Sequence, residues 1–266
     1  MTWNRDSWSF YAVFRRMCIG GIWNAYILRG VVTTNRKWLI KQITCYLFII
    51  SLTLVGILSG NRAITVLREQ IPVERYHTIV IDAGHGGEDG GATSSSGRLE
   101  SQYNLEIALR LDDLMQLLGY RTQMTRRTDT AIYQKGETIA QKKVDDLKQR
   151  VRISNSNDGN VLLSIHQNYF SQGQYSGAQV FYAMNDSSKT LANTLQQNLV
   201  TSLDPGNKRK AKAGEGIYLL EKRTGCGVLI ECGFLSNLSE EALLRQPDYQ
   251  KKLVCVIGTT TASNLP

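Results

Sequence analysis

The stretch "HTIVIDAGHGGEDGG" (residues 77–91) joins an apolar run to a loop rich in glycine and acidic residues, with one histidine. The run "HTIVIDA" (77–83) is short, rich in β-branched residues and bounded by glycine, which predicts a buried strand. The loop would then follow the carboxyl end of that strand, where open α/β sheets commonly bind their ligands. Both the fold and the site can therefore be predicted outward from this stretch.

The glycines of this loop suggest a comparison with the dinucleotide-binding fingerprint GxGxxG. Gly84 and Gly86 match its first two glycines, but Asp89 occupies the third position and Gly90 comes one residue late. The fingerprint also requires a helix to open at once, whereas "ATSSSGR" (92–98) follows here. Acidic side chains in the loop would repel a pyrophosphate, so we set a dinucleotide site aside.

Strand-like and helix-like segments alternate after residue 75. Strands are predicted at 77–83, 120–125, 160–166, 177–184, 216–220 and 227–233. Helices are predicted at 100–118, about 138–156, 188–202, 239–245 and 247–262. This alternation is typical of a single α/β domain with a mostly parallel twisted sheet of about six strands, flanked by helices.

The basic excess of the chain belongs to its N-terminal segment. Residues 1–60 contain seven basic side chains and one acidic side chain, and so carry +6 of the net charge of +8. The remaining 206 residues carry +2, which leaves no extended basic face. The sequence therefore argues against nucleic acid as a partner.

An uncharged, mainly apolar segment (42–60) follows Lys41 and is long enough to cross a bilayer. Arg36 and Lys37 precede it, and positive residues tend to stay on the cytoplasmic side. We interpret the segment as a signal anchor, with a cleaved signal peptide and a buried core helix as the alternatives. A signal anchor or a signal peptide would place the rest of the chain outside the cytoplasm, either membrane-anchored or secreted.

These features divide the chain into four predicted parts. Residues 1–41 form a basic extension that is either cytoplasmic or non-native, and 42–60 form the anchor or signal peptide. A linker covers 61–75. The α/β domain extends over 76–266.

Two of the three histidines stand at the ends of predicted strands: His85 just beyond 77–83, and His166 at the end of 160–166. His77 begins a strand, at the opposite edge, and is excluded. Because parallel strands end at the same edge of a sheet, His85 and His166 are predicted to lie close together. Two histidines commonly share a catalytic zinc ion with one carboxylate, while a fourth position stays open for water.

Glu100 is the candidate for that carboxylate. In the predicted helix 100–118 it lies seven positions before Ile107 and within about 20° of the apolar stripe of Ile107 and Leu111. A metal would explain a carboxylate on the inward face of the first turn. The alternative is an acid stabilised by the helix dipole.

Glu231 closes the apolar run "GVLI" (227–230), where a carboxylate is costly to bury without a role or a partner. At the end of its strand it would face the same metal and act as general base. The alternative is a paired structural carboxylate. Asp82, or a backbone carbonyl, is a candidate for orienting a ligand histidine, with a plain role in the turn as the alternative.

Five motifs, in this order, resemble those of the zinc-dependent N-acetylmuramoyl-L-alanine amidases: "IDAGHGG", the glutamate of "LESQYNL", "TRRTD", "LLSIHQN" and "ECGFLSN". The resemblance covers about 78–262. Segments such as "SGAQVFY" and "KRKAKAGEGIYLL" look closer still to the germination-specific amidases of spore-forming bacteria. The resemblance implies one Zn²⁺ ion bound by His85, Glu100 and His166, and a catalytic role for Glu231.

The same resemblance implies that 76–266 is a catalytic domain that hydrolyses the amide between N-acetylmuramic acid and L-alanine in peptidoglycan. The expected setting is removal of stem peptides from spore cortex, ahead of muramic-δ-lactam formation and germination. Peptidoglycan is the expected partner, with membrane contact through the N-terminal segment, and the sequence identifies no protein partner. The alternatives are a zinc peptidase that cuts within the stem peptide and a non-catalytic peptidoglycan-binding domain on the same fold.

Two loops have further interpretations. The loop glycines are interpreted as clearance that lets backbone and glycan approach the metal closely; they are Gly86, Gly87, Gly90 and Gly91. The basic loop "GNKRKAK" (206–212) either faces acidic groups of glycan and peptide or forms a solvated turn. The sequence leaves the roles of Glu88 and Asp89 open.

Overall fold

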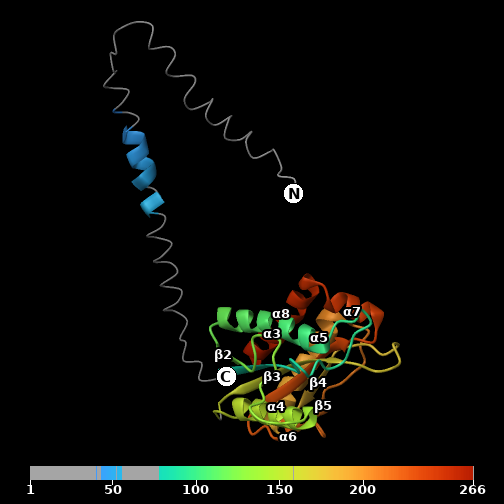
Figure 1. Cartoon of the computed structure of the whole chain (residues 1–266). Coiled ribbons are helices and arrows are strands. Elements are labelled where there is room, and N and C mark those ends of the chain that lie inside the picture. Colours follow the sequence, from blue (N-terminus) through green and yellow to red (C-terminus); the bar gives the residue numbers. More distant parts are fainter. Residues whose placement is uncertain (1–39, 41–42, 52, 56–77, 158, 266) are drawn as a thin grey trace, which may run out of the picture. The chain divides into compact units, whose positions relative to one another are not determined.

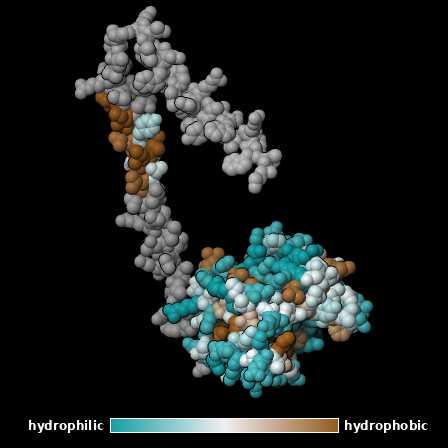
Figure 2. All heavy atoms as spheres, in the orientation of Figure 1, coloured by the Kyte–Doolittle hydropathy of each residue, from teal (hydrophilic) through white to brown (hydrophobic). Residues whose placement is uncertain are grey.

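The computed structural model describes residues 40, 43–51, 53–55, 78–157 and 159–265. The chain divides into two units, Met1–Gln70 and Ile71–Pro266. In the first unit, 43–51 and 53–55 are helical and expose large apolar side chains (Figure 2). None of the helices in these described parts is both long enough and apolar enough to cross a membrane. The predicted segment 42–60 lies partly outside the described residues, and the predicted linker 61–75 lies wholly outside them.

Six strands of the second unit form one sheet in the order β2-β1-β3-β6-β4-β5 (Figure 1). Their bounds are β1 (Thr78–Ala83), β2 (Arg121–Met124), β3 (Val161–Asn168), β4 (Gln179–Tyr182), β5 (Lys212–Ala213) and β6 (Gly227–Phe234). Strands β2, β1, β3 and β6 are parallel, whereas β4 runs antiparallel to β6 and parallel to β5. The predicted α/β domain with a mostly parallel sheet is confirmed, and the antiparallel pairing is confined to β4 and β6.

Helices cover both faces of the sheet. Their bounds are α3 (Glu100–Leu117), α4 (Ile139–Ser154), α5 (Asp186–Leu203), α6 (Tyr218–Glu221), α7 (Leu238–Leu244) and α8 (Pro247–Asn264). Helices α3, α5 and α8 pack together on one face, and α4 and α6 lie on the other (Figure 1). The larger core cluster, with Leu163 and Ile165 of β3, fills the first side, and a smaller one with Leu162 and Leu229 fills the second.

Local sequence signals account for several helix starts. Thr138 caps α4 because its hydroxyl accepts a hydrogen bond from the N–H of Gln141, while the Gln141 side chain accepts one from the N–H of Thr138. This reciprocal pair is a capping box. Asn237 accepts two backbone N–H bonds at the start of α7, and Pro247 stands at the start of α8, where its missing N–H is tolerated.

One predicted strand is wrong: 216–220 contains the start of helix α6. Leu219 and Leu220 are adjacent and both buried. In a strand, adjacent side chains point to opposite faces, so both are buried only if other elements pack against both faces of the sheet. A helical turn instead packs both against the smaller core cluster, and β5 takes the position beside β4. A short apolar run does not distinguish these cases by periodicity.

Candidate active site

The predicted site residues come together at the carboxyl edge of the parallel strands. His85 follows β1 by two residues, and His166 lies on β3 near its end. In the pairing of β3 with β6, His166 stands directly beside Glu231. Glu100 is the first residue of α3 and is 4% exposed.

The side chains of His85, Glu100 and His166 face one another. Nε2 of His85 lies 3.3 Å from Oε2 of Glu100, and Nδ1 of His166 lies 3.1 Å from Oε1 of the same carboxylate. The centroids of the two imidazole rings are 5.0 Å apart. One ligand atom from each residue lies within 4.8 Å of the other two. This cluster could hold a metal ion.

Several hydrogen bonds hold the Glu100 carboxylate in place. The N–H of Ala92 donates to Oε2 at 3.1 Å, and the N–H of Gln167 donates to Oε1 at 3.2 Å. Asn104, one turn further along α3, donates to Oε1 at 3.2 Å and to the carbonyl of Gly84 at 3.1 Å. Burial would raise the pKa of Glu100, but hydrogen bonds from the two histidines hold it well below its usual range. The carboxylate therefore stays ionised, as a metal ligand must.

Asp89 orients the His85 ring. Its Oδ2 lies 2.9 Å from Nδ1 of His85, and Nε2 is left to face Glu100. This hydrogen bond lowers the pKa of Asp89. Burial lowers the pKa of His85, but Asp89 and Glu100 outweigh it and raise that pKa to about 9. Glu88, the other acid whose role was open, forms a surface ion pair with Lys142.

Asp82 has a different role from the one hypothesised. Its Oδ1 accepts hydrogen bonds from Nη1 of Arg150 at 2.6 Å and from Thr125 at 2.8 Å, and its Oδ2 accepts one from Ser164 at 2.6 Å. Burial would raise the pKa of Asp82, but the charge of Arg150 and these hydrogen bonds lower it. Among the described residues no hydrogen bond joins Asp82 to His85 or His166, and its oxygens are engaged instead by these three groups.

Two buried guanidinium groups hold the backbone around His85. Arg150 of α4 donates to the His85 carbonyl at 2.7 Å. Arg126, in the loop after β2, donates to the carbonyls of Gly84 at 3.0 Å and Ser101 at 2.7 Å. His85 has a φ of 60°, which is uncommon for a residue other than glycine, so these contacts stabilise a strained turn. Sequence reasoning missed both arginines, although Arg126 lies in the motif "TRRTD".

Gly84 and Gly91 provide room for the side chains of the cluster. A Cβ atom at Gly84 would lie 2.2 Å from Nε2 of His166, and one at Gly91 would lie 2.6 Å from Oε2 of Glu100. Gly91 also has a φ of +69°, which disfavours other residues. The space that these two glycines leave open is therefore filled by the candidate ligands themselves.

Glu231 adds an unpaired carboxyl group to the cluster. Its Oε2 is buried and has no hydrogen-bond partner within the described residues. Burial raises the pKa of Glu231 to about 7, against the opposing charge of His166. A carboxyl group with a pKa near neutrality can both accept and release a proton, which suits a general acid–base catalyst.

The geometry fits a zinc ion. Ligand atoms that bind tetrahedral zinc at about 2.1 Å stand about 3.4 Å apart. The histidine nitrogens lie 3.3 and 3.1 Å from different oxygens of Glu100, and one ligand atom from each of the three residues lies within 4.8 Å of the others, so the side chains are close enough to share one ion. Two histidines and a carboxylate form a known donor set for catalytic zinc. The unpaired oxygen of Glu231 would then face a water at the open position.

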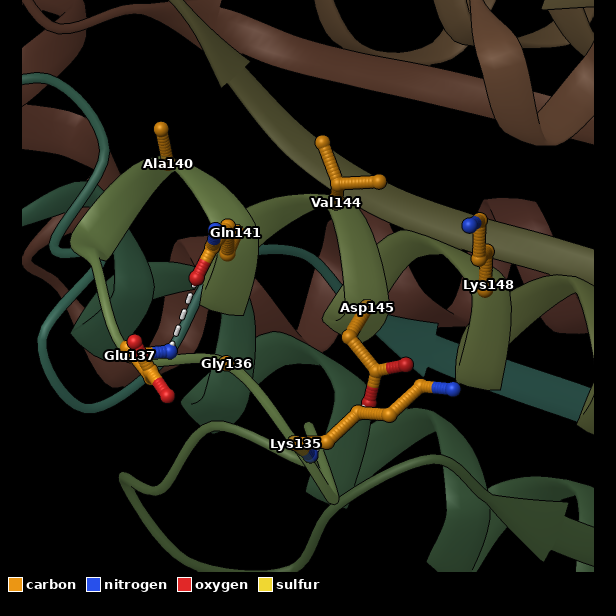
Figure 3. Close-up of a pocket in the computed structure, with 8 residues that line it drawn as sticks. All are labelled: Lys135, Gly136, Glu137, Ala140, Gln141, Val144, Asp145 and Lys148. Atoms are coloured by element: carbon orange, nitrogen blue, oxygen red, sulfur yellow. Dashed lines mark hydrogen bonds between the residues drawn. The ribbon is translucent and has the colours of Figure 1, made fainter.

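A separate groove lies along the start of α4 and the loop before it (Figure 3). Its walls include 135–137, Ala140 and Val144, and a hydrogen bond of 2.9 Å joins the N–H of Glu137 to Oε1 of Gln141. None of the candidate metal ligands lines this groove, and neither does Glu231. We therefore locate the chemistry at the strand edge.

Comparisons with known proteins give a consistent result. Residues 79–259 match a family model described as N-acetylmuramoyl-L-alanine amidase. The chain is 40% identical over 181 residues to the germination-specific N-acetylmuramoyl-L-alanine amidase of Bacillus subtilis, a match that covers 67% of this chain and 76% of that protein. It is 29% identical over 189 residues to the amidase LytC of the same organism, covering 70% of this chain and 35% of LytC.

Solved structures agree with the sequence matches. The CwlD amidase from Clostridioides difficile, solved in complex with the GerS lipoprotein, is 40% identical with a TM-score of 0.67, and the match covers 71% of this chain and 98% of that one. An N-acetylmuramoyl-L-alanine amidase from Clostridium difficile 630 is 30% identical with a TM-score of 0.62, covering 70% and 95%.

Replacing Gly91 tests the packing of the metal cluster. We expect Gly91→Ala to lose most zinc affinity, because its Cβ would collide with Glu100 and with the ring of His85. Gly97→Ala is the matched control, since Gly97 has a φ of +84° but no atom within 4 Å of the added Cβ. It should cost only backbone strain, about 1 kcal/mol. Calorimetric titration with Zn²⁺ distinguishes the two, and equal affinities would contradict this account of Gly91.

Replacing Arg150 tests the support beneath His85. We expect Arg150→Met to lower the free energy of unfolding by about 3–5 kcal/mol, because it leaves the buried Asp82 carboxylate without its cation. Arg152→Met, on the exposed face of the same helix, should cost less than about 0.5 kcal/mol. Urea unfolding measures both. Equal losses would show that the buried ion pair contributes no more than a surface arginine.

Proposed function

The chain belongs to the N-acetylmuramoyl-L-alanine amidase family, whose activity is directed at peptidoglycan, and we propose that it carries out this hydrolysis with one zinc ion. The observation that carries the proposal is the meeting of His85, Glu100 and His166 beside the unpaired carboxyl group of Glu231. The first three residues supply a metal donor set, and the fourth supplies a proton acceptor.

The bond to be cleaved joins the lactyl carboxyl group of N-acetylmuramic acid to the amine of L-alanine. His85, Glu100 and His166 would hold the zinc ion. When bound, zinc lowers the pKa of a coordinated water and polarises a carbonyl oxygen. Hydrolysis adds one water across the C–N bond, and it yields the muramic acid carboxyl group and a free stem peptide.

Glu231 moves the proton in this scheme. Its unpaired Oε2 accepts a proton from the attacking water. The resulting carboxylic acid then donates that proton to the departing nitrogen of L-alanine. A pKa of about 7 suits both steps, and Glu231 is again ionised at the end of the cycle.

Neighbouring residues hold the ligands in a reactive state. Asp89 would accept the proton on Nδ1 of His85, which would leave Nε2 to hold the zinc ion. Asn104 and the N–H of Gln167 direct the Glu100 carboxylate in the same way. This arrangement is set before the substrate binds, which reduces the reorganisation needed for the reaction.

The proposal extends to the biological setting. Identity of 40% to a germination-specific relative supports removal of stem peptides from spore cortex, ahead of muramic-δ-lactam formation. Such a substrate lies outside the cytoplasm, which agrees with the interpretation of 42–60 as a signal anchor or signal peptide. Because the CwlD amidase was solved in complex with the GerS lipoprotein, a lipoprotein partner is also part of the proposal.

Digestion of purified peptidoglycan by the full chain with Zn²⁺ tests the bond that is cut. We expect intact stem peptides that begin with L-alanine, identified by mass spectrometry. Glu231→Gln should reduce kcat by about 10²–10⁴-fold through loss of the proton acceptor. Glu215→Gln, at an exposed glutamate, should retain activity. Cuts within the stem peptide would favour the zinc peptidase instead, and full activity of Glu231→Gln would overturn its catalytic role.

Removal of zinc tests the metal. A strong chelator should abolish activity, and added Zn²⁺ should restore it. The midpoint of thermal unfolding should also fall on chelation, because a ligand that binds only the folded state stabilises it. Activity that survives with no zinc detectable in the protein would contradict the role given to His85, Glu100 and His166.

A further inference from the structure

Arg209 carries a positive charge that the mechanism above does not use. It lies in the loop between α5 and β5, where Nε donates to the carbonyl of Ser176 at 2.8 Å and Nη1 donates to Oε1 of Gln179 at 3.1 Å. Its Cζ lies 4.5 Å from the centroid of the Phe234 ring. These contacts fix the guanidinium in position. No carboxylate among the described residues forms an ion pair with it.

A nearby carboxyl group is already engaged elsewhere. Burial raises the pKa of Glu240, and the charge of Arg209 lowers it only in part. The two oxygens of Glu240, however, accept hydrogen bonds from the backbone N–H groups of Gly177 and Phe234, each at 2.8 Å. Arg209 therefore keeps donors available for an external anion.

Gln179 connects Arg209 to Glu231, the proposed acid–base group. Gln179 is the register partner of Glu231 in the antiparallel pair β4–β6, so both side chains project on the same face, about one strand spacing of 4.8 Å apart. Phe234 follows Glu231 along β6, past an irregularity in the pairing, and is the partner of Asn168. Since Arg209 contacts both Gln179 and Phe234, its guanidinium lies at the same edge of the sheet as Glu231.

The chemistry of the substrate determines which anion can reach this charge. The lactyl carboxyl group is part of the amide to be cleaved, so the sugar presents no carboxylate there. The free carboxylates near that bond belong to the stem peptide. A carboxylate on the second residue of the peptide lies within about 7 Å of the scissile nitrogen, because each residue of an extended chain spans at most about 3.6 Å. A guanidinium binds such a group through two parallel hydrogen bonds.

We propose that Arg209 is a specificity-determining residue that binds a free carboxylate of the stem peptide and so positions the L-alanine amide at Glu231. The inference rests on the proposed function and deepens it. It favours one of the two interpretations of the basic loop 206–212 and assigns the recognition to a single side chain. Arg209 acts on substrate binding, whereas Glu231 acts on proton transfer.

Two synthetic substrates test this role in the full chain with Zn²⁺. One is N-acetylglucosaminyl-N-acetylmuramoyl-L-alanyl-D-glutamate, and the other is the same molecule with both glutamate carboxylates amidated. We expect the wild-type kcat/KM to favour the acid by about tenfold or more, in line with a charge-assisted hydrogen bond. Arg209→Gln should remove this preference mainly by raising KM for the acid. Its kcat/KM for the diamide should change little.

Two further variants separate recognition from structure. Arg209→Lys keeps the charge but not the two-pronged geometry, so it should retain part of the preference. Arg121→Gln, at an exposed arginine of the opposite edge strand β2, should keep the full wild-type preference. Thermal unfolding of each variant checks that the fold is intact.

The outcomes distinguish the recognition role from the proposed function. Equal wild-type rates on the acid and the diamide would overturn the role of Arg209. So would an Arg209→Gln variant that loses activity on both substrates equally and keeps the preference. A wild-type chain that releases L-alanyl peptides from neither these substrates nor peptidoglycan would instead overturn the proposed function itself.

Discussion

The buried carboxylate of Glu100 is the constraint on which the reactive edge depends. A carboxylate 4% exposed at the start of a helix must be compensated, and groups from three separate parts of the chain do so. The N–H of Ala92 comes from the glycine-rich loop, and the N–H of Gln167 comes from β3. His85 and His166 flank its two oxygens. One charged group thus ties the loop after β1, helix α3 and strand β3 together.

A second layer of charge beneath the loop makes this arrangement rigid. Arg150 pairs with Asp82 and also binds the carbonyl of His85, while Arg126 binds carbonyls on both sides of the site. Each guanidinium has several donors in fixed directions, so it can hold a strained backbone turn that lysine could not. Unlike the carboxylates of Asp82 and Glu100, Glu231 has a buried oxygen, Oε2, without a hydrogen-bond partner among the described residues, and this oxygen is available for reaction.

Position at strand ends explains why the main site residues could be predicted. An apolar run followed by His85, or ended by His166 or Glu231, is visible in the sequence, and parallel strands bring such ends to one edge. The supporting residues could not be found in this way. Arg150 is one of many basic residues on a surface helix, and only the fold shows that it points under the loop. Asn104 had a usable signal, since it shares a helix face with Glu100 four residues earlier.

The sequence alone determined the α/β class, most of the helices and strands, and the three candidate ligands with their acid–base partner, because hydrophobic periodicity and strand-end positions are local properties. Only the tertiary structure decided the antiparallel placement of β4, the helix at 218–221 and the contact of Asp89 with His85. These features depend on which strand lies at each edge of the sheet and on which residue accepts a hydrogen bond from each buried donor. Contacts between residues far apart in the chain determine these features, so no local sequence pattern predicts them.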